Sequence, residues 1–137
     1  MTNDDVFQET ISKSNKIVNS IADEMGWNKH QSYQALRVVL HAFRDRLPVE
    51  EAVNFSAQLP ILMKGVFFDT WDPTLKPIKF NRDEFLDFVS LQLPVEYEEM
   101  EVKKIVKTVL GVIFQHVDVH ESEKIKKVLP EDISGLF

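Results

Sequence analysis

The chain has 137 residues, a length that suits one domain or two small halves that share a core. Its residues are 44% hydrophobic and 28% charged with a net charge of −6, a balance that disfavours binding to nucleic acid or to an anionic membrane. The absence of cysteine excludes disulfides and thiolate nucleophiles, and the acidic start of the sequence, without an apolar run, predicts a cytoplasmic protein with no membrane segment.

Two long helices are predicted in the first third of the chain. Residues 3–25 carry apolar side chains near the helical period, and Gly26 suits the position that follows such a helix. Asn28 and Gln31 have the spacing of a capping box, which opens a second helix. Pro48 ends this helix or begins the next one, because proline has no backbone N–H to donate.

A shorter helix is predicted over 49–58, and Pro60 interrupts the chain after it. Because proline removes a backbone donor, a separate short helix should follow. The segment 69–80 then contains Pro73 and Pro77, each of which disfavours helix at the residue before it. We therefore expect an irregular link at 69–80.

The remainder of the chain opens with another capping box, formed by Asn81 and Glu84. The helix that it starts should end at Pro94, and the next helix is predicted to begin within 96–100. Asp118 is suited to cap the helix that follows. Strand signals are sparse, so the whole pattern indicates helices.

A stretch of the first half of the chain recurs in the second half. When the sequence is shifted by 70 residues, Ala35–Phe67 lies over Ile105–Phe137 without a gap. Eight of the roughly 33 aligned positions are identical, where ordinary composition gives about two or three by chance. The identical pairs are Val39/Val109, Leu40/Leu110, Val49/Val119, Glu51/Glu121, Leu59/Leu129, Pro60/Pro130, Gly65/Gly135 and Phe67/Phe137.

These patterns predict an all-α protein built from a duplicated helical unit. Two copies of about three helices each should pack as one bundle with pseudo-two-fold symmetry, because one copy alone has too little apolar surface for a stable core. We expect a single helical domain over 1–137, with a first half at 1–68, a link at 69–80 and a second half at 81–137.

The sequence carries no recognisable catalytic motif. It contains no glycine-rich phosphate loop, no Gly-x-Ser-x-Gly and no cysteine, so we expect a non-enzymatic protein without a cofactor. His116 and His120 have the spacing of two metal ligands on one helix, with Asp118 between them. Because Asp118 should begin a new helix, we interpret both histidines as surface residues and expect no metal site.

Two other groups of residues are candidates for binding. Tyr33, Arg37 and His41 follow one another along the second predicted helix and could line a pocket. His41 equally suits a half-buried structural role. Phe68 and Trp71 lie where the chain leaves the first half and could anchor a partner protein, since tryptophan is enriched in binding hot spots. The alternative is that these aromatic residues pin the link to the core.

Several short motifs occur in a specific order along most of the chain. They are Leu36–Pro48, Glu51-Ala52, Ala57–Pro60, Lys64–Asp69, Trp71–Pro73, Phe85-Leu86 and Leu129–Asp132. In this order and spacing they resemble the uncharacterised bacterial proteins grouped as domain of unknown function family 2267. The resemblance implies a helical bacterial protein, and it assigns no activity, cofactor or site residue.

The sequence supports two main functional hypotheses. The first is a non-enzymatic protein-interaction module that binds a partner protein, or a second copy of itself, near Phe68 and Trp71. The alternative is a small-molecule sensor or carrier whose pocket lies at the junction of the two halves. An enzyme is a third reading, and it would require a cleft that holds paired titratable groups with shifted pKa values.

Overall fold

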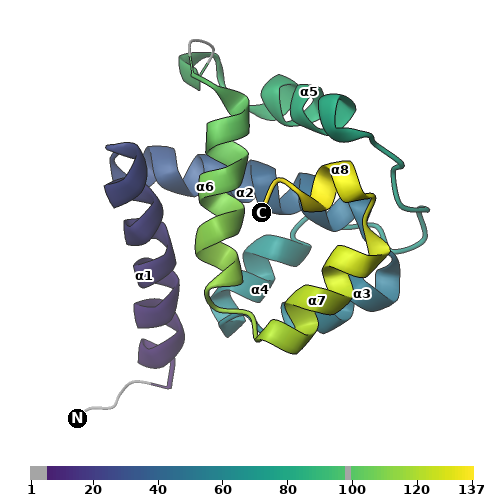
Figure 1. Ribbon diagram of the computed structural model, residues 1–137. Helices are drawn as coiled ribbons and strands as arrows, with labels where there is room; N and C mark the ends of the chain where they lie inside the picture. Colours follow the sequence, from purple (N-terminus) through teal and green to yellow (C-terminus); the bar gives the residue numbers. More distant parts are fainter. Residues whose placement is uncertain (1–5, 98–99) are drawn as a thin grey trace.

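The computed structural model describes residues 6–97 and 100–137, and throughout these residues all regular structure is helical (Figure 1). The all-α prediction is therefore confirmed. None of the described helices is both long and apolar enough to cross a membrane. The helices are α1 (Gln8–Met25), α2 (Lys29–Arg46), α3 (Val49–Ser56), α4 (Ile61–Phe68), α5 (Arg82–Gln92), α6 (Val102–Phe114), α7 (Val119–Val128) and α8 (Glu131–Ser134), with a short 3-10 helix at Val95–Tyr97.

Side-chain capping begins several of these helices. Asn28 Oδ1 accepts a hydrogen bond from the backbone N–H of Gln31 at 2.8 Å, and Gln31 Oε1 accepts one from the N–H of Asn28 at 3.2 Å. Asn81 and Glu84 form the same reciprocal pair at the start of α5, at 2.9 and 3.0 Å. Both predicted capping boxes are thus present, and each satisfies backbone N–H groups that the first helical turn leaves free.

Other helix boundaries also follow the predictions. Gly26 ends α1 with a positive φ of 69°, a conformation that glycine adopts without strain. Pro60 and Pro130 stand immediately before α4 and α8, which confirms the two predicted breaks. Asp118 Oδ1 accepts a hydrogen bond from the N–H of Glu121 at 2.8 Å and so begins α7, as predicted.

The first helix begins later in the structure than the periodicity predicts. α1 starts at Gln8 after a turn at 6–7, and its N-cap residue, Phe7, makes no side-chain cap. The predicted positions 3–5 lie outside the described part of the chain. Within α1, Ile17 and Ile21 are fully buried, so the apolar stripe that predicted this helix does face the core.

The helix expected to begin within 96–100 instead begins at Val102. The chain after Pro94 first forms the 3-10 helix, in which Tyr97 is buried. The hydroxyl of Tyr97 donates a hydrogen bond of 2.6 Å to the backbone oxygen of Gln31. The contact of Tyr97 with α2 joins residues far apart in the sequence, so the local sequence pattern at 96–100 could not predict it.

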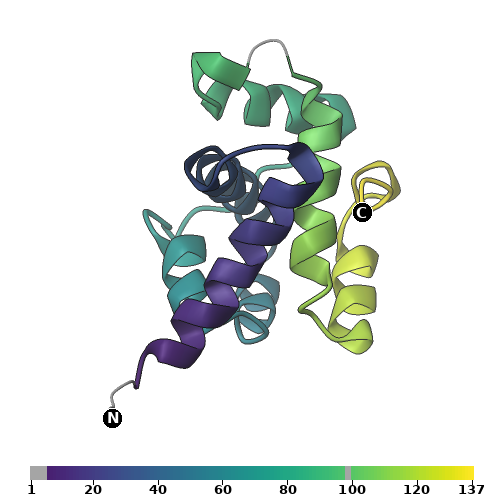
Figure 2. The same cartoon turned by 90° about the vertical axis from the view of Figure 1, so that its left-hand side faces the viewer.

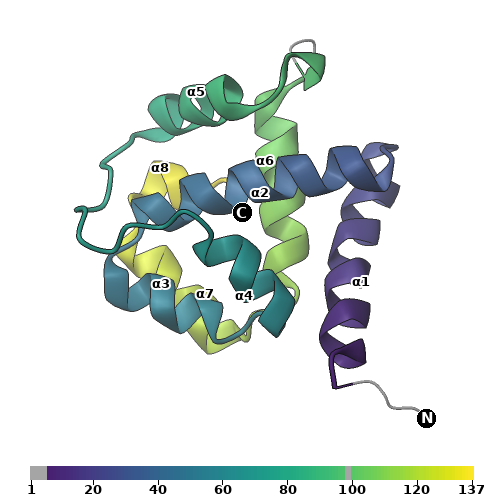
Figure 3. The same ribbon diagram turned by 180° about the vertical axis from the view of Figure 1, so that it is seen from behind.

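The helices form one bundle in which neighbours along the chain are not always neighbours in space. α1 and α6 lie side by side, and α2 runs across them (Figures 1 and 2). Seen from behind, α5 lies on one side of α2 and α4 on the other (Figure 3). α3 and α7 pack against each other at the end of the bundle away from α5.

The core is made by residues from both halves, and positions paired by the 70-residue shift are buried together. The centre is formed by α2 and α6, which contact each other directly. Paired positions that are both buried include Ala35/Ile105, Leu36/Val106, Val39/Val109, Leu40/Leu110, Phe43/Ile113, Phe55/Ile125, Leu59/Leu129 and Met63/Ile133.

Aromatic rings close one end of this core. Phe43 contacts Phe55 edge-on with ring centres 5.2 Å apart, and it contacts Phe114 and Phe137 in the same way at 5.9 and 5.7 Å. Phe114 and Phe137 stack on each other at 4.5 Å. Because these rings come from α2, α3, α6 and the last residue of the chain, they join the two halves through apolar burial.

Candidate functional site

The polar side of α2 carries a group of residues that hold the end of α4. His41 and Arg44 are one helical turn apart, so both point toward the same neighbouring segment. His41 Nε2 donates to the backbone oxygen of Val66 at 2.7 Å, since a carbonyl oxygen can only accept. Arg44 donates through one NH group to the backbone oxygens of Phe67 and Asp69, both at 2.9 Å. These contacts satisfy carbonyl groups that a helix leaves free at its last turn.

Arg44 is a buried cation, with only 4% of its surface exposed. Its Nε donates to Asp45 Oδ1 at 2.8 Å, which places an acidic group beside the guanidinium. Arg37, about two turns before Arg44, forms an ion pair of 3.2 Å with Asp69 in a far more exposed setting. The two arginines therefore differ in role: Arg44 is part of the packed interior, while the charge of Arg37 faces solvent.

The electrostatic setting of His41 favours its neutral form. Burial lowers the pKa of His41 below the ordinary value of 6.5, and the positive charges of Arg44 and Arg37 lower it further. The carbonyl of Val66 and the carboxylate of Asp45 act in the opposite direction. At neutral pH the imidazole is thus a neutral hydrogen-bond donor to α4, which fits the half-buried structural role described from the sequence.

A hollow of about 300 Å³ lies between α2 and α5, and we call it the α2–α5 hollow. Two of the three residues predicted to line a pocket, Arg37 and His41, belong to its lining. The third, Tyr33, does not line it and is 38% exposed elsewhere on α2. The full lining is Arg37, Val38, His41, Ala42, Arg44, Asp45, Thr70, Phe88 and Gln92.

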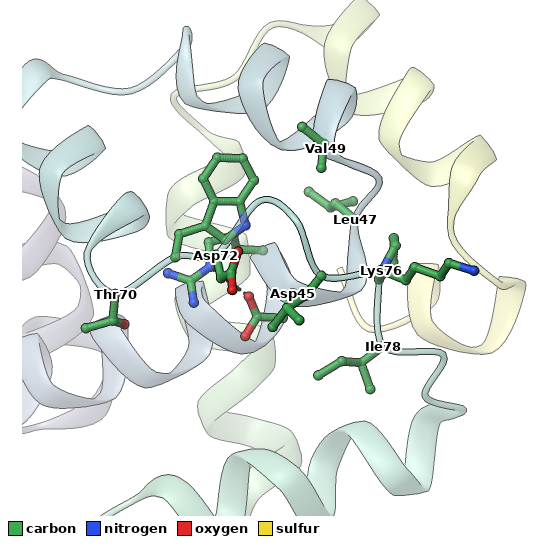
Figure 4. A pocket seen from close by; sticks show the side chains of 11 residues that line it. Asp45, Leu47, Val49, Thr70, Asp72, Lys76 and Ile78 are labelled. Atoms are coloured by element: carbon green, nitrogen blue, oxygen red, sulfur yellow. Dashed lines mark hydrogen bonds and ion pairs between the residues drawn. The ribbon is translucent and has the colours of Figure 1, made fainter.

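A second hollow, of about 100 Å³, lies where the link passes the end of α2 (Figure 4). Leu47 and Val49 lie on one side of it and Thr70 on the other, with Asp45 and Asp72 between them. The N–H of Ile78 donates to the backbone oxygen of Asp45 at 2.8 Å, and this hydrogen bond joins the link to α2. This volume is well below the roughly 300 Å³ at which pockets for drug-sized ligands begin.

The predicted interaction residues are Phe68, the last residue of α4, and Trp71, which lies near the start of the link. Both are half-buried and pack against the hydrophobic core. Their rings are 4.9 Å apart, and Phe68 also meets Phe67 edge-on at 5.0 Å. Trp71 also lines the hollow beside the link. Contacts within the molecule thus cover much of the surface of the Phe68 and Trp71 side chains.

The sequence analysis did not identify an exposed apolar surface where α1 and α4 begin. It consists of Val6, Phe7, Ile61 and Leu62, which are 90%, 67%, 73% and 49% exposed, and we call it the α1–α4 patch. Thr10 ties the two helices together here, because its hydroxyl oxygen accepts from the N–H of Leu62 at 2.8 Å. A hollow of about 300 Å³ opens between the helices at this point.

A signal for this patch is present in the sequence repeat. The 70-residue shift pairs Ile61 with Glu131 and Leu62 with Asp132. The second half therefore has acidic residues at the exposed start of α8, as expected for a solvated helix N-terminus. Ile61 and Leu62 are instead apolar, although both are exposed.

The paired histidines near the end of α6 do not lie on one helix. His116 follows α6, where its Nδ1 lies 3.1 Å from the backbone oxygen of Val112, and His120 belongs to α7. Asp118 between them is engaged in capping α7. Among residues 6–97 and 100–137, no group of three or more potential metal-ligating side chains comes together.

Comparison with known proteins identifies a family for this chain, but it assigns no role to the residues of the site. The chain matches the family model described as uncharacterized conserved protein (DUF2267) over residues 14–136. No curated protein matches it. The family match covers nearly the whole chain. The resemblance seen in the sequence motifs is thus confirmed, and the chain belongs to the DUF2267 family.

Proposed function

We propose that this protein is a non-enzymatic interaction module that binds a partner protein through the α1–α4 patch. The supporting observation is the exposure of Val6, Phe7, Ile61 and Leu62 at one place on the surface. Monomeric proteins rarely keep contiguous apolar patches of more than a few hundred Å² in water, and larger ones mark interaction sites. The proposal moves the contact away from Phe68 and Trp71, whose rings pack against the core.

The partner that fits this surface presents an apolar side chain to the hollow between the helices. Phe7 and Ile61 would flank the inserted group, and their burial supplies about 25 cal/mol for each Å² removed from water. The ion pair of Glu9 and Lys13, at 2.7 Å, lies on the same side of the molecule as a polar rim. An apolar centre with a charged edge is the usual composition of a protein interface.

The test replaces the patch with the residues found at the same offset in the second half. The double variant Ile61→Glu and Leu62→Asp should abolish affinity capture of a partner and any self-association seen by light scattering. Leu91→Glu is the matched control, because Leu91 is 82% exposed but lies on α5. Capture that survives the double variant, or a strict monomer that captures nothing reproducibly, would contradict the proposal.

The α2–α5 hollow favours a second candidate function, a sensor or carrier of a small anion. Arg37 offers N–H donors to it and keeps its positive charge at all physiological pH values. A carboxylate ligand of a few carbon atoms would suit this volume and charge. In a thermal-shift screen of carboxylic acids and metal salts, a stabilising acid should lose its effect in Arg37→Ala. Lys107→Ala is the control, since Lys107 is exposed at the same offset in the second half.

We also propose that the two halves are related by a pseudo-two-fold axis. The packing of the helices supports this idea, because α1 contacts α6 while α5 contacts α2, and α2 contacts α6 while α3 contacts α7. Such reciprocal contacts are expected when the same surface meets itself across an axis. Rotation of residues 35–67 onto residues 105–137 should bring Leu40 over Leu110 and Pro60 over Pro130, which superposition of the two segments in a crystal structure tests. Non-equivalent positions for these pairs would refute the duplication.

A further inference from the structure

Two glutamates that are paired by the internal repeat meet where α3 packs against α7. Glu51 is the third residue of α3, and Glu121 is the third residue of α7. The two side chains are only 13% and 10% exposed. The 70-residue shift pairs exactly these positions, so the same acidic side chain reaches the contact between the halves from both sides.

The carboxyl groups are not satisfied by the rest of the chain. Oε2 of Glu51 and Oε2 of Glu121 are both buried, and neither has a hydrogen-bond partner within the part of the chain that the structure describes. Lys124 Nζ lies 4.0 Å from Oε1 of Glu51 and 3.8 Å from Oε1 of Glu121. One ammonium group thus stands beside two carboxyl groups, and a second negative charge in this place would be left uncompensated.

Adjacent carboxyl groups withdrawn from water cannot both remain ionised, because like charges repel and burial disfavours each charge. We infer that Glu51 and Glu121 hold one proton between them, which is donated from one Oε2 to the other across the contact of α3 with α7. The pair then carries a single negative charge, which Lys124 balances. Sharing the proton also gives both buried Oε2 atoms the hydrogen bond that they otherwise lack.

The surroundings of the pair agree with this assignment. Burial raises the pKa of Glu121, the positive charge of Lys124 lowers it, and the negative charges of Glu51 and Asp118 raise it again. The charged groups that face Glu121 are Glu51 from α3, Asp118 at the N-cap of α7 and Lys124 within α7. A metal ion is a poorer occupant, because no third ligating side chain joins these two glutamates in the described residues.

The shared proton makes docking of α7 onto α3 depend on pH. In the unfolded chain the carboxyl of Glu121 has its ordinary pKa of 4.5, whereas burial raises that pKa in the folded protein and so keeps the shared proton bound to higher pH. The folded state therefore binds more protons than the unfolded state above that value. The stabilisation is fully present below the unfolded pKa, and it is lost as the pH rises through the pKa of the folded pair.

The experiment measures unfolding by urea from about pH 4.5 to pH 8 in the wild type and in Glu121→Gln. The glutamine amide donates a hydrogen bond to Glu51 without needing a proton. Relative to this variant, the unfolding equilibrium constant of the wild type should rise by up to tenfold per pH unit through the titration of the pair. Glu123→Gln is the matched control, because Glu123 is exposed on the same helix. It should keep the wild-type pH dependence.

Equal pH dependence in Glu121→Gln and Glu123→Gln would overturn the shared proton. A second measurement does not depend on the variants. Carbon-13 NMR of the glutamate side-chain carboxyl groups in the wild-type protein should show one member of the pair titrating well above 4.5, the ordinary value. If Glu51 and Glu121 both titrate near that ordinary value, the inference is wrong even when a variant fails to fold.

Discussion

At the scale of single residues, Arg44 shows how a charged side chain stabilises this fold from inside. Its guanidinium holds the backbone oxygens of Phe67 and Asp69, and it pairs with the carboxylate of Asp45. When one partner of a buried hydrogen bond is removed, the protein loses more stability than the hydrogen bond itself had contributed. The extra loss arises because the remaining polar group stays buried without a partner. Arg44 therefore holds the end of α4 and the start of the link against α2.

Replacing Arg44 by alanine should destabilise the protein by about 3 kcal/mol, because the guanidinium hydrogen bonds to Phe67 O, Asp69 O and the Asp45 carboxylate are all lost. Arg37→Ala is the comparison, and its exposed ion pair should be worth about 0–1 kcal/mol. Urea unfolding followed by circular dichroism measures both changes. Equal losses in the two variants would mean that the buried contacts of Arg44 contribute little.

His41 should make stability depend on pH in the direction opposite to the glutamate pair. Its pKa is lowered in the folded protein, chiefly by burial, so the unfolded chain binds more protons between that lowered value and 6.5. The free energy of unfolding of the wild type, relative to His41→Gln, should therefore rise as the pH increases toward 6.5 and fall as the solution becomes more acidic.

Urea unfolding of both proteins between about pH 5 and pH 8 measures this difference. His30→Gln provides the control, since His30 is exposed near the start of α2. A constant difference between wild type and His41→Gln over the whole range would show that His41 does not titrate abnormally.

At the scale of helices, the chain places strong capping signals at the starts of α2 and α5, which occupy different places in the two halves. Each capping box satisfies two backbone N–H groups through short-range contacts alone. Such signals favour the correct helix start before any tertiary contact forms. The helices that follow prolines, α3, α4 and α8, have no side-chain cap, and they depend more on packing.

Asn28→Ala and Asn81→Ala should each destabilise the protein by about 1 kcal/mol, because each removes an acceptor from a first-turn N–H. Asn15→Ala is the control, since Asn15 is exposed in the interior of α1 and alanine favours helix. This variant should change the free energy of unfolding by less than about 0.5 kcal/mol. Thermal and urea unfolding report all three values, and a neutral Asn28→Ala would contradict the capping role.

At the scale of the whole molecule, the core cannot be divided between the halves. α1 is covered partly by α6, and α2 is covered by α5 and α6. The ring cluster of Phe43, Phe55, Phe114 and Phe137 likewise draws on both ends of the chain. A half on its own would expose the faces that now meet, and short chains have little other apolar surface to bury.

Residues 1–68 and 81–137 should therefore be largely unfolded when each is produced alone. Circular dichroism of the separate fragments should show little helix, while an equimolar mixture should regain helical signal if the halves find each other. The intact chain is the reference for the full signal. Cooperative thermal unfolding of the 1–68 fragment by itself would contradict a shared core.

The sequence alone determined the helical class, most helix boundaries, the family and the pattern of core positions. These follow from short-range chemistry and from periodicity: the capping boxes, the prolines at 60 and 130, and apolar stripes that repeat at an offset of 70 residues. Only the tertiary structure decided which polar groups meet. Arg44 on the end of α4, Glu51 against Glu121, and the exposure of Ile61 depend on which helix faces come together, and no local pattern encodes those contacts between distant segments.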